Sequence, residues 1–266
     1  MEDKIQIVTR YFSQMDVLLL EKWEKALDKG IIQFRYPEEL DITKRTRENS
    51  YQYETCTGID ERQQEVINII CNDSIIDIFS IVHEFSHYAN GTYKNKFLPF
   101  SIYLYGEGFA NFFEENFFSK LKNTELKKDS ILYYNRLVES FYIKSIDFEF
   151  YAVFMDIYLT FGKITNDTIL KYVERKKYND QYATLLLEEV EELNQKYSDP
   201  IECFINHPFD EARYIIGFFL SHYAESYSEE VVLKDYWQLE RLKVDTLEKK
   251  YLKVDESYKQ KLKYRK

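Results

Sequence analysis

Residues 74–91 read SIIDIFSIVHEFSHYANG, and this stretch predicts the central helix of the fold. Asp73 or Ser74 can cap the start of the helix, and Gly91 can end it. Its apolar residues repeat with helical spacing at Ile75, Ile78, Phe79 and Val82. One stripe of this helix should therefore face a hydrophobic core.

The segments before this helix predict one helix and two strands. Residues 3–29 have the pattern of an amphipathic helix that Gly30 ends, and DITKRTRENS (41–50) is typical of a loop. YQYETCTG (51–58) and EVINIIC (65–71) are rich in Tyr, Val, Ile and Thr, which favours two short strands joined by a turn. A small β-hairpin should therefore lead directly into the central helix.

The segments after this helix predict more helices. FSIYLYGEGFANFFEENFFSKL (100–121) should form the next one, and a charged helical segment should begin near residue 230. Further helices are expected over 125–162, 166–175, 181–196 and 209–226. The predicted fold class is therefore mainly α with a small β-hairpin or sheet. We expect a single domain over 1–266, with an N-terminal part (1–64), a core (65–225) and a C-terminal helical tail (226–266).

The composition excludes several classes of protein. The chain has 266 residues, of which 45% are hydrophobic and 31% charged, and only seven Gly and four Pro, which disfavours a turn-rich all-β fold. A net charge of -10 argues against a nucleic-acid or membrane partner, since both attract cationic surfaces. No apolar run approaches the roughly 20 residues that span a bilayer, and the first residues have no signal-peptide pattern.

Cysteine use indicates a reducing compartment. Cys56, Cys71 and Cys203 are odd in number and widely spaced, so they predict neither a disulfide framework nor a Cys-x-x-Cys zinc site. The expected location is the cytoplasm.

His83, Glu84 and His87 form an H-E-x-x-H motif inside the central helix. Residues i and i+4 share one helix face, so the two imidazoles can bind one Zn²⁺ while Glu84 holds the metal-activated water. A catalytic zinc needs a third protein ligand, and we expect Glu107, which lies 20 residues after His87 and between two glycines. Glu114 and Glu115 lie two turns further on and suit partners that orient a ligating histidine.

These two blocks resemble the gluzincin metallopeptidases of the oligopeptidase F and thimet oligopeptidase family. NIICNDSIIDIFSIVHEFSH (68–87) is similar to the strand and zinc-motif helix of that family, with Ser86 in place of its usual Gly. EGFANFFEE (107–115) is similar to its glutamate helix, with Glu107 in the ligand position. The resemblance implies a zincin-like catalytic domain with one Zn²⁺ per chain.

A weaker resemblance involves INHPFDEARYIIGFFLSHYA (205–224), which is similar to a late family segment that binds the substrate and the tetrahedral intermediate. It implies catalytic roles for His207 and Tyr214. Family members are about twice as long, and their additional N-terminal lobe forms one wall of a deep channel. A chain of this length implies a more open cleft or a protein partner that completes it.

The predicted activity is zinc-dependent hydrolysis of peptide bonds in oligopeptides or extended segments, with Glu84 as general base and acid. We expect EVINIIC to hold the peptide by edge pairing. The alternative is an inactive pseudopeptidase that binds a protein or peptide in its cleft, although such a module has no physical need for an intact H-E-x-x-H. A purely structural helical protein is a third hypothesis.

Overall fold

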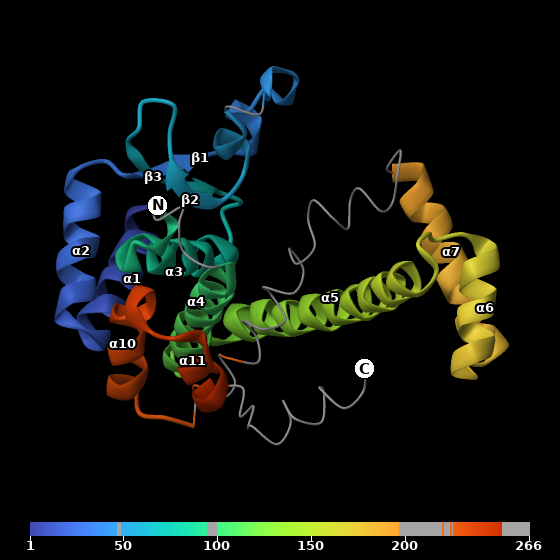
Figure 1. The fold of residues 1–266 in the computed structure, drawn as a ribbon. Helices are drawn as coiled ribbons and strands as arrows, with labels where there is room; N and C mark the ends of the chain where they lie inside the picture. Colours follow the sequence, from blue (N-terminus) through green and yellow to red (C-terminus); the bar gives the residue numbers. More distant parts are fainter. Residues whose placement is uncertain (47–48, 95–99, 197–219, 221–223, 225, 252–266) are drawn as a thin grey trace. The chain divides into compact units, whose positions relative to one another are not determined.

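The computed structural model describes residues 1–46, 49–94, 100–196, 220, 224 and 226–251 (Figure 1). They form a mainly helical fold with one small sheet, as predicted. By its contacts the chain groups into two compact units, residues 1–138 with 216–266, and residues 139–215. The single domain expected over 1–266 stays a prediction.

Helix α3 (Ile75–Asn90) has the predicted bounds. Ser74 caps it by accepting a hydrogen bond from the backbone N–H of Ile76, and Gly91 ends it in the left-handed conformation at φ 77°. Near its start, the fully buried carboxylate of Asp77 accepts hydrogen bonds from Lys4 Nζ at 2.6 Å and from the Asn72 N–H at 2.9 Å. This pairing compensates the charge that folding buries.

The sheet has three strands where a two-stranded hairpin was expected. β2 (Cys56–Ile59) and β3 (Glu65–Ile70) are antiparallel, as a hairpin requires, but β1 (Ile32–Arg35) pairs parallel to β3 on its other side. The order β1-β3-β2 makes β3 the central strand. EVINIIC therefore cannot offer a free edge to a peptide, and that expectation is wrong.

The N-terminal segment forms two helices instead of one. α1 (Glu2–Met15) ends at Asp16, whose backbone is extended, and α2 (Val17–Asp28) begins immediately after it. The Asp16 side chain accepts hydrogen bonds from the N–H groups of Leu18 and Leu19 at 2.8 and 3.0 Å. Asp favours this capping geometry over a helix interior, and this preference explains the break.

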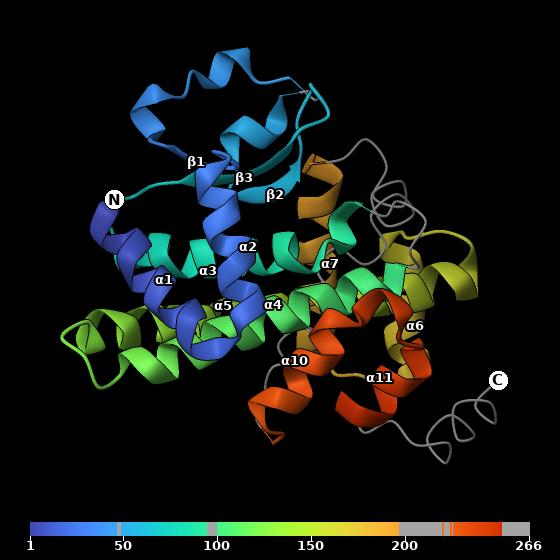
Figure 2. The same ribbon diagram turned by 90° about the vertical axis from the view of Figure 1, so that its left-hand side faces the viewer.

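Within the first unit, α3 lies between the sheet and α4 (Phe100–Leu121), whose bounds were predicted correctly (Figures 1 and 2). α10 (Glu229–Trp237) and α11 (Val244–Tyr251) complete its core. The buried Tyr236 hydroxyl donates to the backbone oxygen of Ser86 at 2.6 Å. The C-terminal helices are therefore attached directly to α3.

The second unit takes in α5 (Lys127–Phe161) from Glu139 onward, α6 (Asn166–Lys176) and α7 (Asp180–Lys196). These three helices agree with the predicted ranges. The unit has its own apolar cluster, whose fully buried members are Phe154, Ile157, Ile169 and Leu186. Five short 3-10 helices lie elsewhere in the described chain, at Pro37–Glu39, Ile42–Lys44, Ser50–Tyr53, Thr92–Lys94 and Leu239–Arg241.

Two sequence predictions fall outside or largely outside the described residues. These are the helix expected over 209–226 and the part of the C-terminal tail from 252 onward. Among the helices that the structure describes, none combines the length and apolarity that crossing a membrane requires.

Gly108 on α4 packs closely against Leu220. A Cβ at position 108 would lie 2.8 Å from Leu220 Cβ, too close for any real contact. Because Leu220 Cβ is fixed to its backbone, rotation of the side chain cannot relieve this clash.

Gly108→Ala should therefore lower the free energy of unfolding by about 1–3 kcal/mol, although alanine normally favours a helix over glycine by about 0.5–1 kcal/mol. Gly58→Ala is the matched control, since a Cβ there would meet nothing within 4 Å. Urea denaturation of both variants measures the difference. A Gly108→Ala protein as stable as the wild type would contradict the packing.

Candidate metal centre

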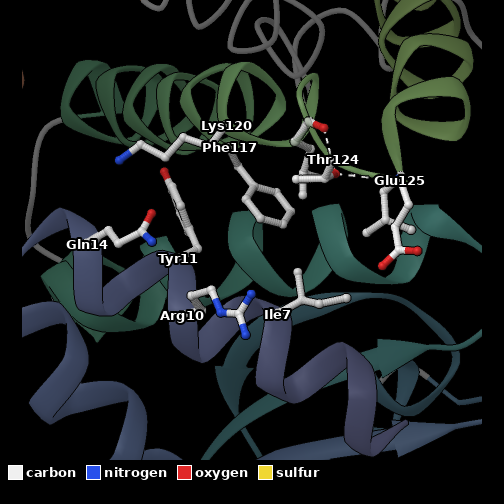
Figure 3. Close-up of a pocket in the computed structure, with 10 residues that line it drawn as sticks. Ile7, Arg10, Tyr11, Gln14, Phe117, Lys120, Thr124 and Glu125 are labelled. Atoms are coloured by element: carbon white, nitrogen blue, oxygen red, sulfur yellow. Dashed lines mark hydrogen bonds between the residues drawn. The ribbon is translucent and has the colours of Figure 1, made fainter.

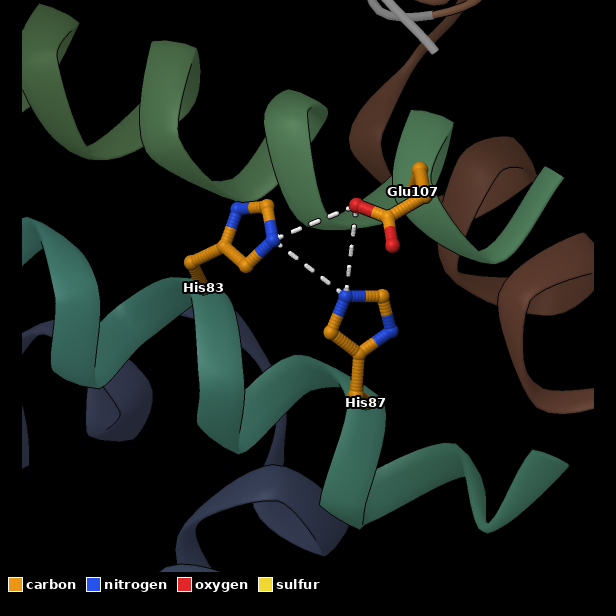
Figure 4. Close-up of side chains that lie close together, drawn as sticks. All are labelled: His83, His87 and Glu107. Carbon is orange, nitrogen blue, oxygen red and sulfur yellow. Dashed lines mark hydrogen bonds and ion pairs between the residues drawn. The ribbon is translucent and has the colours of Figure 1, made fainter. Parts of the chain in front are cut away.

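Three predicted ligands meet between α3 and α4 (Figure 4). His83 and His87 lie one turn apart on α3, and Glu107 reaches them from α4. The two Nε2 atoms are 3.3 Å apart, and Glu107 Oε2 lies 3.4 Å from His83 Nε2 and 3.7 Å from His87 Nε2. All three side chains are largely buried, with 14–17% of each exposed.

The spacing of these donor atoms fits a tetrahedral zinc ion. With bonds of about 2.0–2.1 Å, two corners of a zinc tetrahedron are about 3.3–3.4 Å apart, and the three observed separations are 3.3, 3.4 and 3.7 Å. Two imidazoles and one carboxylate are also a donor set that zinc accepts. The residues therefore fit the ion without a large rearrangement.

Glu114 orients the first histidine. His83 Nδ1 lies 2.7 Å from Glu114 Oε1, and Tyr133 Oη donates to the other oxygen of this buried carboxylate at 3.3 Å. The Tyr133 ring stacks on Phe79 at 4.1 Å, which holds the phenol in place. Nδ1–H is therefore committed to Glu114, and Nε2 is directed at the other donors. Glu115 is also buried but lies outside the donor cluster.

The histidines and the carboxylates of this cluster change one another's pKa. Burial alone would lower the pKa of His83, but Glu114 and Glu107 raise it well above the usual range. Burial alone would raise the pKa of Glu107, yet the two histidines hold it well below. Without a metal, a proton on His83 thus provides the positive charge that the carboxylates need.

Glu84 lies on the side of α3 that faces β2. Its backbone oxygen accepts a hydrogen bond from Thr57 Oγ1 at 2.7 Å, and its carboxylate contributes to the raised pKa of His83. Burial, with a smaller contribution from Glu84, raises the pKa of the Cys56 thiol on β2 to about 11. The Glu84 carboxylate is therefore close to both His83 and Cys56 on the edge strand.

Ser86, which replaces the glycine of the resembled motif, is buried and fills a structural role. Its hydroxyl donates to the backbone oxygen of His83 at 2.7 Å, and its own backbone oxygen accepts from Tyr236. Sequence reasoning identified neither Tyr133 nor Tyr236. Nothing marks these two among 24 tyrosines, because their partners lie on other helices.

His207 and Tyr214, the predicted substrate-binding residues, lie outside the described residues, as does Cys203. Their roles stay predictions.

Glu114→Gln should weaken zinc binding by about tenfold or more, since loss of a residue that orients a ligand typically costs 10- to 100-fold in affinity. The amide retains the shape but loses the charge opposite His83. Competition with a chromophoric chelator measures the affinity. Glu115→Gln is the matched control at the adjacent buried position, and an equal loss in both variants would contradict the assigned role.

Zinc binding should release protons at pH 7, because the metal must displace the proton that the raised pKa keeps on His83. Below that pKa the proton competes with zinc, so zinc affinity should rise with pH, continue to rise past the ordinary histidine value of about 6.5, and level off above the raised pKa. Calorimetry in buffers of different ionisation enthalpy counts the protons. Glu114→Gln should shift the rise of zinc affinity to lower pH, because Glu114 raises the pKa of His83. Zinc binding that releases no proton would show that His83 does not carry one in the metal-free protein.

Comparison of the chain with protein-family models, with curated proteins and with solved structures finds no match. Membership of the gluzincin family stays a prediction that depends on the quoted motifs.

Proposed function

We propose that this chain is a zinc-dependent peptidase. The observation that carries the proposal is the triangle of His83 Nε2, His87 Nε2 and Glu107 Oε2 with a second carboxylate, Glu84, beside the first ligand. Structural zinc sites use four protein ligands, whereas catalytic sites use three and keep one position open. The cluster among the described residues supplies three.

Zinc bound here would lower the pKa of a coordinated water towards about 7 and polarise a peptide carbonyl. His83, His87 and Glu107 hold the ion, and Glu114 fixes the ring of His83. Glu84 is part-exposed and its carboxylate acts electrostatically on His83, so it is the group on this chain that would accept a proton from the attacking water and deliver it to the leaving amine.

The outer edge of β2 is the best place for an extended substrate. β2 pairs with β3 on one side, and no described strand pairs with its other side. Thr57 joins this strand to the backbone of Glu84. A peptide that adds to this edge would pass the carboxylate and would be held through backbone groups, which implies broad sequence tolerance.

A reducing compartment such as the cytoplasm suits the chain. Burial is the main cause that raises the pKa of the Cys56 and Cys71 thiols to about 11. Neutral, buried thiols react slowly and serve as small apolar residues.

Glu84→Gln should keep one zinc per chain but lower peptide cleavage by about 10²- to 10⁴-fold, the usual contribution of general acid–base catalysis. Elemental analysis of protein purified without chelator measures the metal, and a quenched fluorescent peptide library measures cleavage. Glu61→Gln, an exposed residue in the β2–β3 turn, is the charge-matched control.

His83→Ala should lose both zinc and activity. Wild-type protein that binds zinc but cleaves no peptide would indicate the pseudopeptidase alternative. Wild-type protein that binds no zinc after add-back would overturn the proposal.

A further inference from the structure

A cavity of about 400 Å³ lies between α1 and the end of α4 with the turn that joins α4 to α5 (Figure 3). It shares no lining residue with the metal cluster or Glu84. Its volume falls at the lower end of the range of about 300–1,000 Å³ in which proteins bind small molecules.

The interior of this cavity is apolar and held in place. Its apolar lining consists of Ile7, Tyr11, Phe117, Leu121 and Leu126. The Tyr11 hydroxyl donates to the backbone oxygen of Phe113 at 3.0 Å, and the Tyr11 ring packs on Phe117 at 4.8 Å. These contacts join α1 to α4, so the wall is formed before any ligand arrives.

Two opposite charges border the apolar interior without pairing. Figure 3 shows Arg10 and Glu125 on two different sides of the Phe117 ring. Neither side chain has an ion-pair partner in the part of the chain that the structure describes, although both line the same cavity. Lys120 differs, because it lies over the Tyr11 ring and 3.8 Å from Glu229.

The turn that carries Glu125 is preorganised. Thr124 Oγ1 donates to the backbone oxygen of Leu121 at 2.7 Å and accepts from the Leu126 N–H at 3.2 Å. On α1, Gln14 lies one turn after Arg10 on the same face and offers both a donor and an acceptor to the cavity. A ligand would therefore meet a carboxylate, a guanidinium and an amide around an apolar floor.

We infer that this cavity binds a zwitterionic dipeptide with apolar side chains. The ligand carboxylate pairs with Arg10, whose planar fork suits it, and the ligand ammonium pairs with Glu125. Gln14 can bond the peptide group, and the side chains occupy the apolar interior. A simple anion would meet repulsion at Glu125, and a simple cation would meet repulsion at Arg10. This inference does not depend on the peptidase activity.

The test is calorimetric titration of the full chain, freed of metal so that no peptide is cleaved, with leucyl-phenylalanine. The N-acetylated dipeptide lacks the ammonium, and the C-terminal amide lacks the carboxylate. We expect saturable binding of the dipeptide and about three- to tenfold weaker binding of each blocked form.

Two variants locate the charges. Arg10→Gln should weaken binding of the dipeptide by about three- to tenfold and leave binding of the C-terminal amide unchanged. Glu125→Gln should weaken binding of the dipeptide by the same factor and leave binding of the N-acetylated form unchanged. Both residues are exposed, so folding should be unchanged, and circular dichroism checks this. Arg136→Gln and Glu139→Gln remove the same charges at exposed positions that do not line the cavity.

Three outcomes would overturn the inference. One is the absence of saturable heat with millimolar dipeptide. Another is binding of the acetylated form as tight as that of the dipeptide, which would show that Glu125 plays no part. The third is that Arg136→Gln and Glu139→Gln weaken dipeptide binding as much as Arg10→Gln and Glu125→Gln do. None of these outcomes bears on zinc or on cleavage, so the two proposals fail independently.

Discussion

The contact of α3 with α4 places one imidazole between two carboxylates, and the candidate metal centre depends on this arrangement. Glu107 and Glu114, two turns apart on α4, face the two ring nitrogens of His83. Glu84 adds a third negative charge nearby. So many carboxylates in a largely buried site are unfavourable unless positive charge balances them. A proton on His83 does this in the metal-free protein, and a divalent cation bound by the same residues would supply positive charge in its place.

The parts of the fold that could be predicted from sequence are those whose causes are local. α3 was predicted correctly because Ser74 and Gly91 mark its ends and its apolar residues follow one period. Glu107, the third donor, was predicted because it lies 20 residues after His87, which suffices for a turn and a helix that returns to the histidines. The break at Asp16 also had a local signal, a capping residue between two apolar runs, which the single-helix interpretation overlooked.

The parts that could not be predicted depend on contacts between distant residues. β1 has only four residues and pairs parallel with a strand more than 30 positions later, so no turn signals it. Tyr133 and Tyr236 act on α3 from other helices, and no pattern distinguishes them from the remaining tyrosines. The close neighbour of Gly108 is Leu220, which follows the entire second unit in sequence, so no local pattern reveals this contact.

The first unit is discontinuous in sequence, and this affects the order in which the chain can fold on the ribosome. α3 and α4 emerge early, but Leu220 and Tyr236, which cover Gly108 and hold Ser86, emerge only after residues 139–215. At about 5–20 residues per second, translation of that insertion takes on the order of ten seconds. During this interval the half-finished core exposes apolar surface, while the second unit can fold on its own cluster. The donor residues are thus synthesised well before the core that holds them is complete, and nascent chains are the stage at which chaperones would matter most.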